Sequence, residues 1–158
     1  MKVENVTPTE KTRQSALLEI VYPSEIQQPL IFVVIASRYE DRWIFVRHKD
    51  RDTYEIPAGH IEPGEDPTEA AKRELYEESG AIEYTLDLVS PYGARIDGTP
   101  MIYGLLFYAQ VTRLGKLPEY EIAERAFFEN IPEHLTYPEI QPLLIEKVCT
   151  WLKENRPS

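Results

Sequence analysis

A cluster of carboxylates lies in one short stretch of this chain, Gly59 to Ala81, which reads GHIEPGEDPTEAAKRELYEESGA. In a helix, residues three and four positions apart share a face, so Glu74, Glu77 and Glu78 would lie within one turn of each other. Like charges so placed repel unless a cation lies between them. Clustered carboxylate oxygens are ligands that Mg²⁺ and Mn²⁺ prefer. A solvated acidic helix face is the alternative interpretation of the same spacing.

The element that must position these carboxylates is predicted to be a helix with a signal at each end. Asp66 is a good N-cap, Pro67 suits the first helical position, and Glu69 completes an Asp-x-x-Glu variant of the capping box. Gly80 supplies the C-terminal stop. Three apolar residues are left to pack on a core: Ala70, Ala71 and Leu75.

A longer pattern surrounds this helix. It runs from Gly59 through five residues to Glu65, then through seven residues to Arg-Glu-Leu-x-Glu-Glu-x-Gly, which ends at Gly80. This pattern resembles the complete signature of the Nudix hydrolase family. One position departs from it, because Ala81 is small where the family usually has a larger aliphatic residue, and we interpret this as a packing variation. The resemblance is specific over Tyr54 to Ala81 and covers most of the chain in outline.

The resemblance implies a metal site built from named residues. Glu74 and Glu78 match the signature positions that bind Mg²⁺ or Mn²⁺, and the backbone carbonyl of Ala58 is expected as a further ligand. Glu77 matches a position that binds metal or orients water in many members. Arg73 matches the arginine that holds the glutamates by ion pairs, so it would act through them.

The general base is predicted on one of two elements. Glu77 or Glu78 on the helix is the first choice. The second is a later loop, where Glu121 is favoured over Glu119 and Glu124 by its distance from the strand that follows. A solvated loop carboxylate fits Glu121 equally well.

The activity that the resemblance implies is metal-dependent hydrolysis of the diphosphate linkage in a nucleoside diphosphate joined to another group. Arg47, Arg51 and Tyr54 precede the signature and are expected to contact the phosphate or base of this small nucleotide substrate. The overall size and the closing stretch, Phe128 to Val148, resemble small bacterial family members assigned to oxidised or ordinary nucleoside triphosphates. This resemblance favours a nucleoside triphosphate pyrophosphohydrolase, with 8-oxo-dGTP as a candidate substrate.

Two other functions stay open at this point. The lead-in Pro57-Ala58-Gly59 resembles that of family members that hydrolyse ADP-ribose or ADP-sugars. A non-catalytic nucleotide sensor is an alternative of another class, although such proteins typically have a damaged signature or an added domain. The intact signature favours an enzyme, because it supplies every carboxylate that the mechanism requires.

Composition bounds the rest of the prediction. The 158 residues suit a single domain, with Met1 to Arg13 as a loose lead-in. A net charge of −10 argues against nucleic acid polymers and anionic membrane surfaces as partners. A single cysteine, Cys149, suits a reducing cytoplasm, and no apolar run is long enough for a membrane span. Homodimers are common in the family, so a dimer is an option.

The expected fold is α/β, an α/β/α sandwich with a mixed sheet, as the resemblance implies. Two helices are predicted, the signature helix in mid-chain and an amphipathic C-terminal helix from Glu139 onward, with Ile140, Leu143 and Leu144 on its apolar face. A loop is expected over Leu114–Glu124. The strand candidates are residues 16–22, 30–36, 43–48, 84–89, 92–95, 101–112 and 126–128.

Overall fold

The computed structural model describes residues 18–155, so the predicted lead-in over residues 1–13 lies outside the described chain. Its elements in chain order are β2 (Leu18–Val21), β3 (Leu30–Tyr39), β4 (Arg42–His48), β5 (Ala58–His60), α1 (Pro67–Ser79), β6 (Ala81–Ile96), β7 (Ile102–Leu114), β8 (Ile122–Phe128) and α2 (Gln141–Asn155). Within these residues no helix has the length and apolarity needed to cross a membrane.

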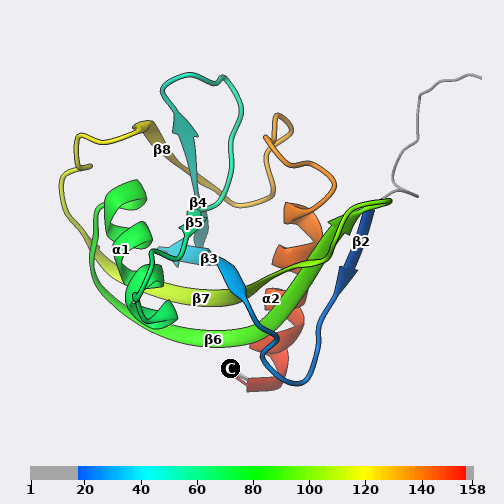
Figure 1. Cartoon of the computed structure of the whole chain (residues 1–158). Helices are drawn as coiled ribbons and strands as arrows, with labels where there is room; N and C mark the ends of the chain where they lie inside the picture. The colour runs from blue at the N-terminus through cyan, green and yellow to red at the C-terminus, as the bar shows by residue number, and fades with distance from the viewer. Residues whose placement is uncertain (1–17, 156–158) are drawn as a thin grey trace, which may run out of the picture.

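The strands of the described chain form one mixed sheet in the order β2-β6-β7-β3-β4-β8, with β5 also paired to β3 (Figure 1). The β3 and β7 strands run parallel, whereas the other pairs are antiparallel. At its far end β3 pairs with β4, and nearer its start it pairs with β5. This separation leaves room for the segment before β5 to enter beside β3.

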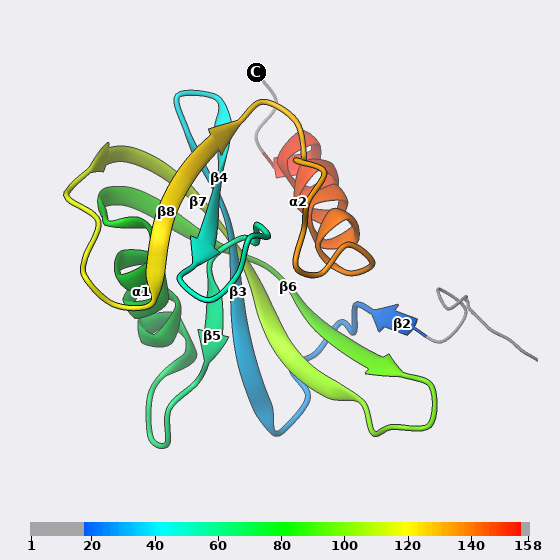
Figure 2. The same ribbon diagram turned by 90° about the horizontal axis from the view of Figure 1, so that it is seen from above.

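The two helices cover opposite faces of the sheet (Figure 2). Alternation along β3 produces both cores, because successive side chains point to opposite faces. Val33 and Ile35 belong to the cluster that packs under α1, together with Leu75. Val34 belongs to the second cluster, which includes Leu144 of α2. The predicted α/β/α sandwich with a mixed sheet is confirmed.

The signature helix has both of its predicted caps. The Asp66 carboxylate accepts hydrogen bonds from the backbone N–H groups of Thr68 at 3.0 Å and Glu69 at 3.4 Å. Gly80 has a φ of 75° and its N–H bonds to the carbonyl of Tyr76. A positive φ is strained for residues with a Cβ, which explains the glycine at this end.

Three details of the sequence prediction are corrected. The two strands expected at 84–89 and 92–95 are one strand, β6, which continues through a register shift between Leu88 and Ser90. The loop expected to reach Glu124 ends earlier, because pairing with β4 extends β8 back to Ile122. Leu143 is 45% exposed, and Ile145 lies in the core instead, since the buried face of α2 turns away from Leu143.

The anchoring of α1 on the sheet can be tested with Leu75→Ala. Leu75 has no exposed surface. We expect its truncation to lower the free energy of unfolding by about 2–5 kcal/mol in urea titrations, because it leaves a cavity under the helix. The matched control is Tyr76→Ala on the exposed side of the same turn, where the side chain is 48% exposed. Equal losses in the two variants would contradict this packing.

Candidate active site

The short segment Tyr54–Ala58 lies at the base of the site, and three of its backbone N–H groups point to the same side of the segment. The N–H of Tyr54 donates to the carbonyl of His134 at 2.7 Å. The N–H of Ile56 donates to the side-chain oxygen of Gln141 at 3.0 Å, and that of Ala58 donates to the Glu78 carboxylate at 3.1 Å. The opposite edge accepts from β3, where Ile35 donates to the carbonyl of Pro57. A side chain from each helix is thus held on the same edge.

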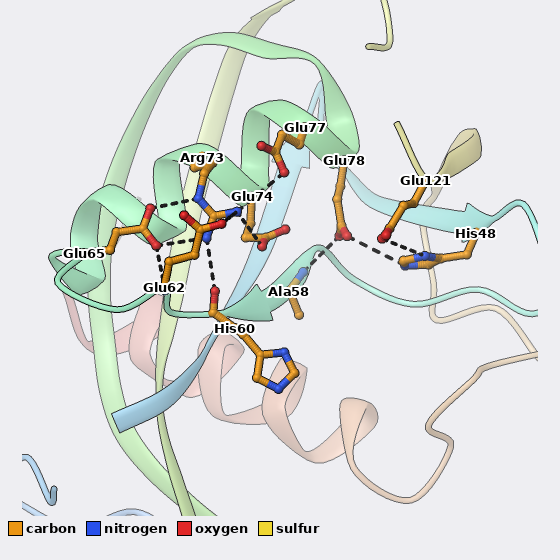
Figure 3. A network of polar contacts seen from close by, with 10 residues as sticks. All are labelled: His48, Ala58, His60, Glu62, Glu65, Arg73, Glu74, Glu77, Glu78 and Glu121. Carbon is orange, nitrogen blue, oxygen red and sulfur yellow. Dashed lines mark hydrogen bonds and ion pairs between the residues drawn. The ribbon is translucent and has the colours of Figure 1, made fainter. Parts of the chain in front are cut away.

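Arg73 organises the glutamates of α1 and its preceding loop (Figure 3). Its guanidinium donates twice to Glu65, at 2.8 and 2.9 Å, and once to Glu74 at 2.9 Å. It also donates to the carbonyl of His60 and lies 3.5 Å from Glu77. The hydrogen bond from Arg73 lowers the pKa of Glu65 to about 2. The same bond raises the pKa of Arg73. This fits the positioning role that the resemblance implied for Arg73.

Glu78 is a buried acid, with only 7% of its surface exposed. Burial, reinforced by the charges of Glu74, Glu55 and Glu121, raises the pKa of Glu78 to about 8, against the opposing effect of the Ala58 N–H. Burial also raises the pKa of Glu74. The fold therefore holds the Glu74 and Glu78 carboxylates where water stabilises their charged forms poorly.

Gly59 lies where β5 passes close to the Glu74 side chain of α1. A Cβ at this position would lie 2.0 Å from an oxygen of the Glu74 carboxylate, well inside van der Waals contact. The first glycine of the signature thus allows the strand to pass directly under the acidic face of the helix.

His48 is a site residue that the sequence analysis missed. At the end of β4, its Nε2 lies 3.4 Å from Glu55. The same atom lies 3.7 Å from Glu78, while its Nδ1 lies 4.0 Å from Glu121 (Figure 3). No metal-ligand spacing marks it in the sequence. The available signal was its place at the end of a buried strand, where a polar side chain emerges at the edge of the sheet.

A cleft of about 840 Å³ extends from these carboxylates toward α2. Among the residues with predicted substrate contacts, Arg51 lines it, whereas Arg47 and Tyr54 are not among its described lining residues. Those two side chains both bond to Glu124, at 3.1 and 3.3 Å. The cleft thus joins the acidic cluster to a more apolar region near β6 and α2.

Beside the cleft is a hollow of about 250 Å³. The predicted catalytic and metal-binding side chains meet there, because its lining residues are Arg73, Glu74, Glu77, Glu78, Tyr120, Glu121 and Ile122. Ala58, the remaining predicted ligand, lines the cleft alongside Glu74 and Glu78. The residues predicted from the sequence to be catalytic or to bind metal therefore lie together around the hollow and the adjoining cleft.

The donor chemistry of this place suits a divalent cation. Across residues 18–155 no three acidic, histidine or cysteine side chains already stand in coordinating positions. Arg73 holds one oxygen of Glu74, and the Glu77 carboxylate is turned toward the same guanidinium (Figure 3). Four carboxylates line the hollow against one cation, Arg73. Such an excess of hard oxygen ligands around a buried acid fits Mg²⁺ or Mn²⁺.

A family model described as the NUDIX domain matches residues 27–140. The chain therefore belongs to the Nudix hydrolase family. The YtkD protein of Bacillus subtilis strain 168, named as a candidate 8-oxo-dGTP diphosphatase, is 32% identical over 105 residues, which are 66% of this chain and 65% of that protein. Rat diphosphoinositol polyphosphate phosphohydrolase 2 is 41% identical over 54 residues, but the match spans only 24% of that relative.

Solved structures agree with the fold. A mutant of the Bacillus subtilis pyrophosphohydrolase BsRppH superposes with a TM-score of 0.74 at 24% identity, covering 92% of this chain and 96% of that one. A UDP-X diphosphatase superposes with a TM-score of 0.67 at 22% identity, covering 84% and 67% of the two chains.

The burial of Glu78 predicts an unusual dependence of stability on pH. Because its folded pKa of about 8 exceeds its ordinary value of 4.5, the folded protein holds a proton that the unfolded chain releases between these values. Without divalent cations, the free energy of unfolding should therefore fall as pH rises from 5 to 8, by up to about 1.4 kcal/mol per pH unit.

Urea titrations at pH 5, 6, 7 and 8 in EDTA measure this slope. Glu78→Gln should flatten it, whereas Glu77→Gln, a matched change on the more exposed side of the helix, should keep it. A wild-type slope that survives in Glu78→Gln would show that the effect belongs to another group.

Proposed function

We propose that this protein hydrolyses the diphosphate linkage of a nucleotide in a reaction that needs Mg²⁺ or Mn²⁺. The observation that carries the proposal is the burial of Glu78 beside Glu74 under an otherwise intact Nudix signature. A buried cluster of carboxylates lowers stability unless it binds a cation, so the presence of this cluster suits a metal-dependent function. The bound cation would shield the phosphates and lower the pKa of water.

The chain's own residues divide the remaining work. Glu74, Glu78 and the carbonyl of Ala58 would hold the cation, with Glu77 as a further ligand. Arg73 keeps Glu74 oriented and Glu65 in place by hydrogen bonds. Because α1 is capped at both ends and anchored on the core by Leu75, these groups would keep their positions as the substrate binds.

We propose Glu78, with Glu77 as the alternative, as the group that accepts the proton from the attacking water. The N–H of Ala58 holds one oxygen of the Glu78 carboxylate at 3.1 Å, so this group has a fixed position from which to accept a proton. Glu121 is the competing candidate. Its side chain is 84% exposed, and within residues 18–155 its ion-pair partner is His48, whose Nδ1 lies 4.0 Å away. Exposure leaves it free to approach a substrate but gives it no fixed position.

The substrate that we propose is a nucleoside triphosphate, cleaved to the monophosphate and pyrophosphate, with 8-oxo-dGTP as the first compound to test. Its support is the likeness to YtkD over 105 residues. We propose Arg51 as a phosphate contact, and its support is that it lines the cleft and bonds to Glu55 beside the acidic cluster at 2.7 Å.

The proposal predicts that Glu78→Gln and Glu77→Gln each lose turnover while keeping the fold. For Glu78→Gln we expect a loss of about 10²–10⁴-fold in kcat, the range for removal of a general base or metal ligand. The assay is Mg²⁺-dependent release of pyrophosphate from 8-oxo-dGTP, with circular dichroism and melting curves as fold controls. Full turnover by both folded variants would end the proposal.

The choice between helix and loop bases is tested by Glu121→Gln. Because Glu121 is exposed and loosely held, we expect a fall in kcat of at most about tenfold, well short of that in Glu78→Gln. Its matched control is Glu119→Gln in the same loop. A loss as large as that in Glu78→Gln, absent from the control, would assign the base to the loop.

A further inference from the structure

We propose that Gln141 reads the nucleobase of the substrate and selects a 6-keto purine. This inference rests on the proposed hydrolysis of a nucleotide, and it names the group in the cleft that would decide which base is accepted. The observation behind it is the fixed orientation of one buried amide.

Gln141 is the first residue of α2 and only 4% of its surface is exposed. Its side-chain oxygen accepts the N–H of Ile56 at 3.0 Å. Only the oxygen of an amide can accept, so this bond fixes which way the side chain points. The Nε2 amino group must then point away from Ile56, and neither of its two hydrogens has a bonding partner within residues 18–155.

That amino group is presented to the cleft. Gln141 lines the cleft, and its Nε2 is not completely enclosed by protein. In the described chain the completely enclosed side-chain polar atoms without a partner are Ser37 Oγ and Arg38 Nε. Because the Gln141 side chain is almost wholly buried and its oxygen is held by the backbone of Ile56, its amino group has a fixed direction in which to donate. Loss of the surrounding water makes such a donor selective, because an unmatched ligand would leave it unpaired.

The surroundings of Gln141 suit a flat aromatic ligand. The cleft that Gln141 lines is also lined by aromatic and aliphatic side chains: Val34, Tyr92, Ala94, Tyr137, Ile140 and Leu144. A nucleobase could pack among them and present its polar edge to the amide.

The distance to the acidic cluster suits a nucleotide. Gln141 and Glu78 are bonded to the N–H groups of Ile56 and Ala58, which are two residues apart on an extended segment. Two residues of strand span roughly 7 Å. A base held at Gln141 would therefore bring its nearest phosphates toward the carboxylates.

The hydrogen-bond pattern decides which base fits. An adenine edge is read by an amide that both donates and accepts, whereas a guanine edge offers the acceptors O6 and N7. The oxygen of Gln141 is already engaged by Ile56, which leaves the two amino hydrogens of this lining residue for a ligand in the cleft. The amide is therefore matched to the 6-keto edge of a purine and mismatched to the 6-amino group of adenine.

The test is the ratio of kcat/KM for dGTP and dITP to that for dATP, with Mg²⁺, in wild type and Gln141→Met. Both keto substrates carry O6, and dITP removes the 2-amino group as an explanation. We expect wild type to prefer them by about tenfold or more, and the variant to bring the ratio near one through KM. A residue that only supports the fold would lower all three values together and leave the ratio unchanged, which would overturn the inference.

Two further variants keep the test decisive. Gln141→Met leaves the N–H of Ile56 without its acceptor, so Gln141→Glu, which retains an acceptor oxygen, is measured at pH 9 and should lose the same preference. Leu143→Met changes the exposed side of the same turn and should keep the wild-type ratio.

Failure of the proposed function would look different. If wild type cleaves none of the triphosphates, calorimetric Kd values for dGTP and dATP with Mg²⁺ still measure selection by Gln141. Tighter binding of dGTP that Gln141→Met abolishes would support the inference without hydrolysis. Equal binding of the two nucleotides by wild type would overturn it.

Discussion

The site depends on one short backbone edge that has no strand partner along its central part. Ile56 and Ala58 direct their N–H groups to the same side, and side chains from the two helices take the place of a neighbouring strand. An unpaired buried N–H is costly, so these bonds hold Gln141 and Glu78 firmly. Helices on opposite faces of the sheet thereby deliver their functional groups to a common cleft.

Charge is the second constraint, and it opposes stability. Glu74 and Glu78 are pushed toward their protonated forms by burial, while Arg73 is largely committed to Glu65 and Glu74. A divalent cation would relieve this repulsion and stabilise the folded chain by mass action. The same arrangement that weakens the cation-free protein would then make the site selective for a metal-bound phosphate. The repulsion between these buried carboxylates therefore explains both the expected instability of the cation-free protein and the proposed binding of a divalent cation.

Much of this could be predicted from the sequence because the relevant signals are local. The caps at Asp66 and Gly80 and the spacing of the glutamates specify a helix and its acidic face. Gln141 could not be predicted, because its role comes from a contact with a residue distant in the chain. For His48 the only signal was its place at the end of a buried strand, since its partners are also distant in the chain. Glu124 was misplaced for the same reason, because its strand is defined by pairing with β4. The single domain, the homodimer and the cytoplasmic location stay predictions.

The central claim is that Glu78 is a buried acid whose charge a cation stabilises. NMR titration of its carboxyl carbon, assigned by comparison with Glu78→Gln, measures this directly. Without divalent cations the account predicts a midpoint near a pKa of about 8, and added Mg²⁺ should move the midpoint well below that value. A midpoint near the ordinary value of 4.5 without cations, or one that Mg²⁺ leaves unchanged, would contradict the account.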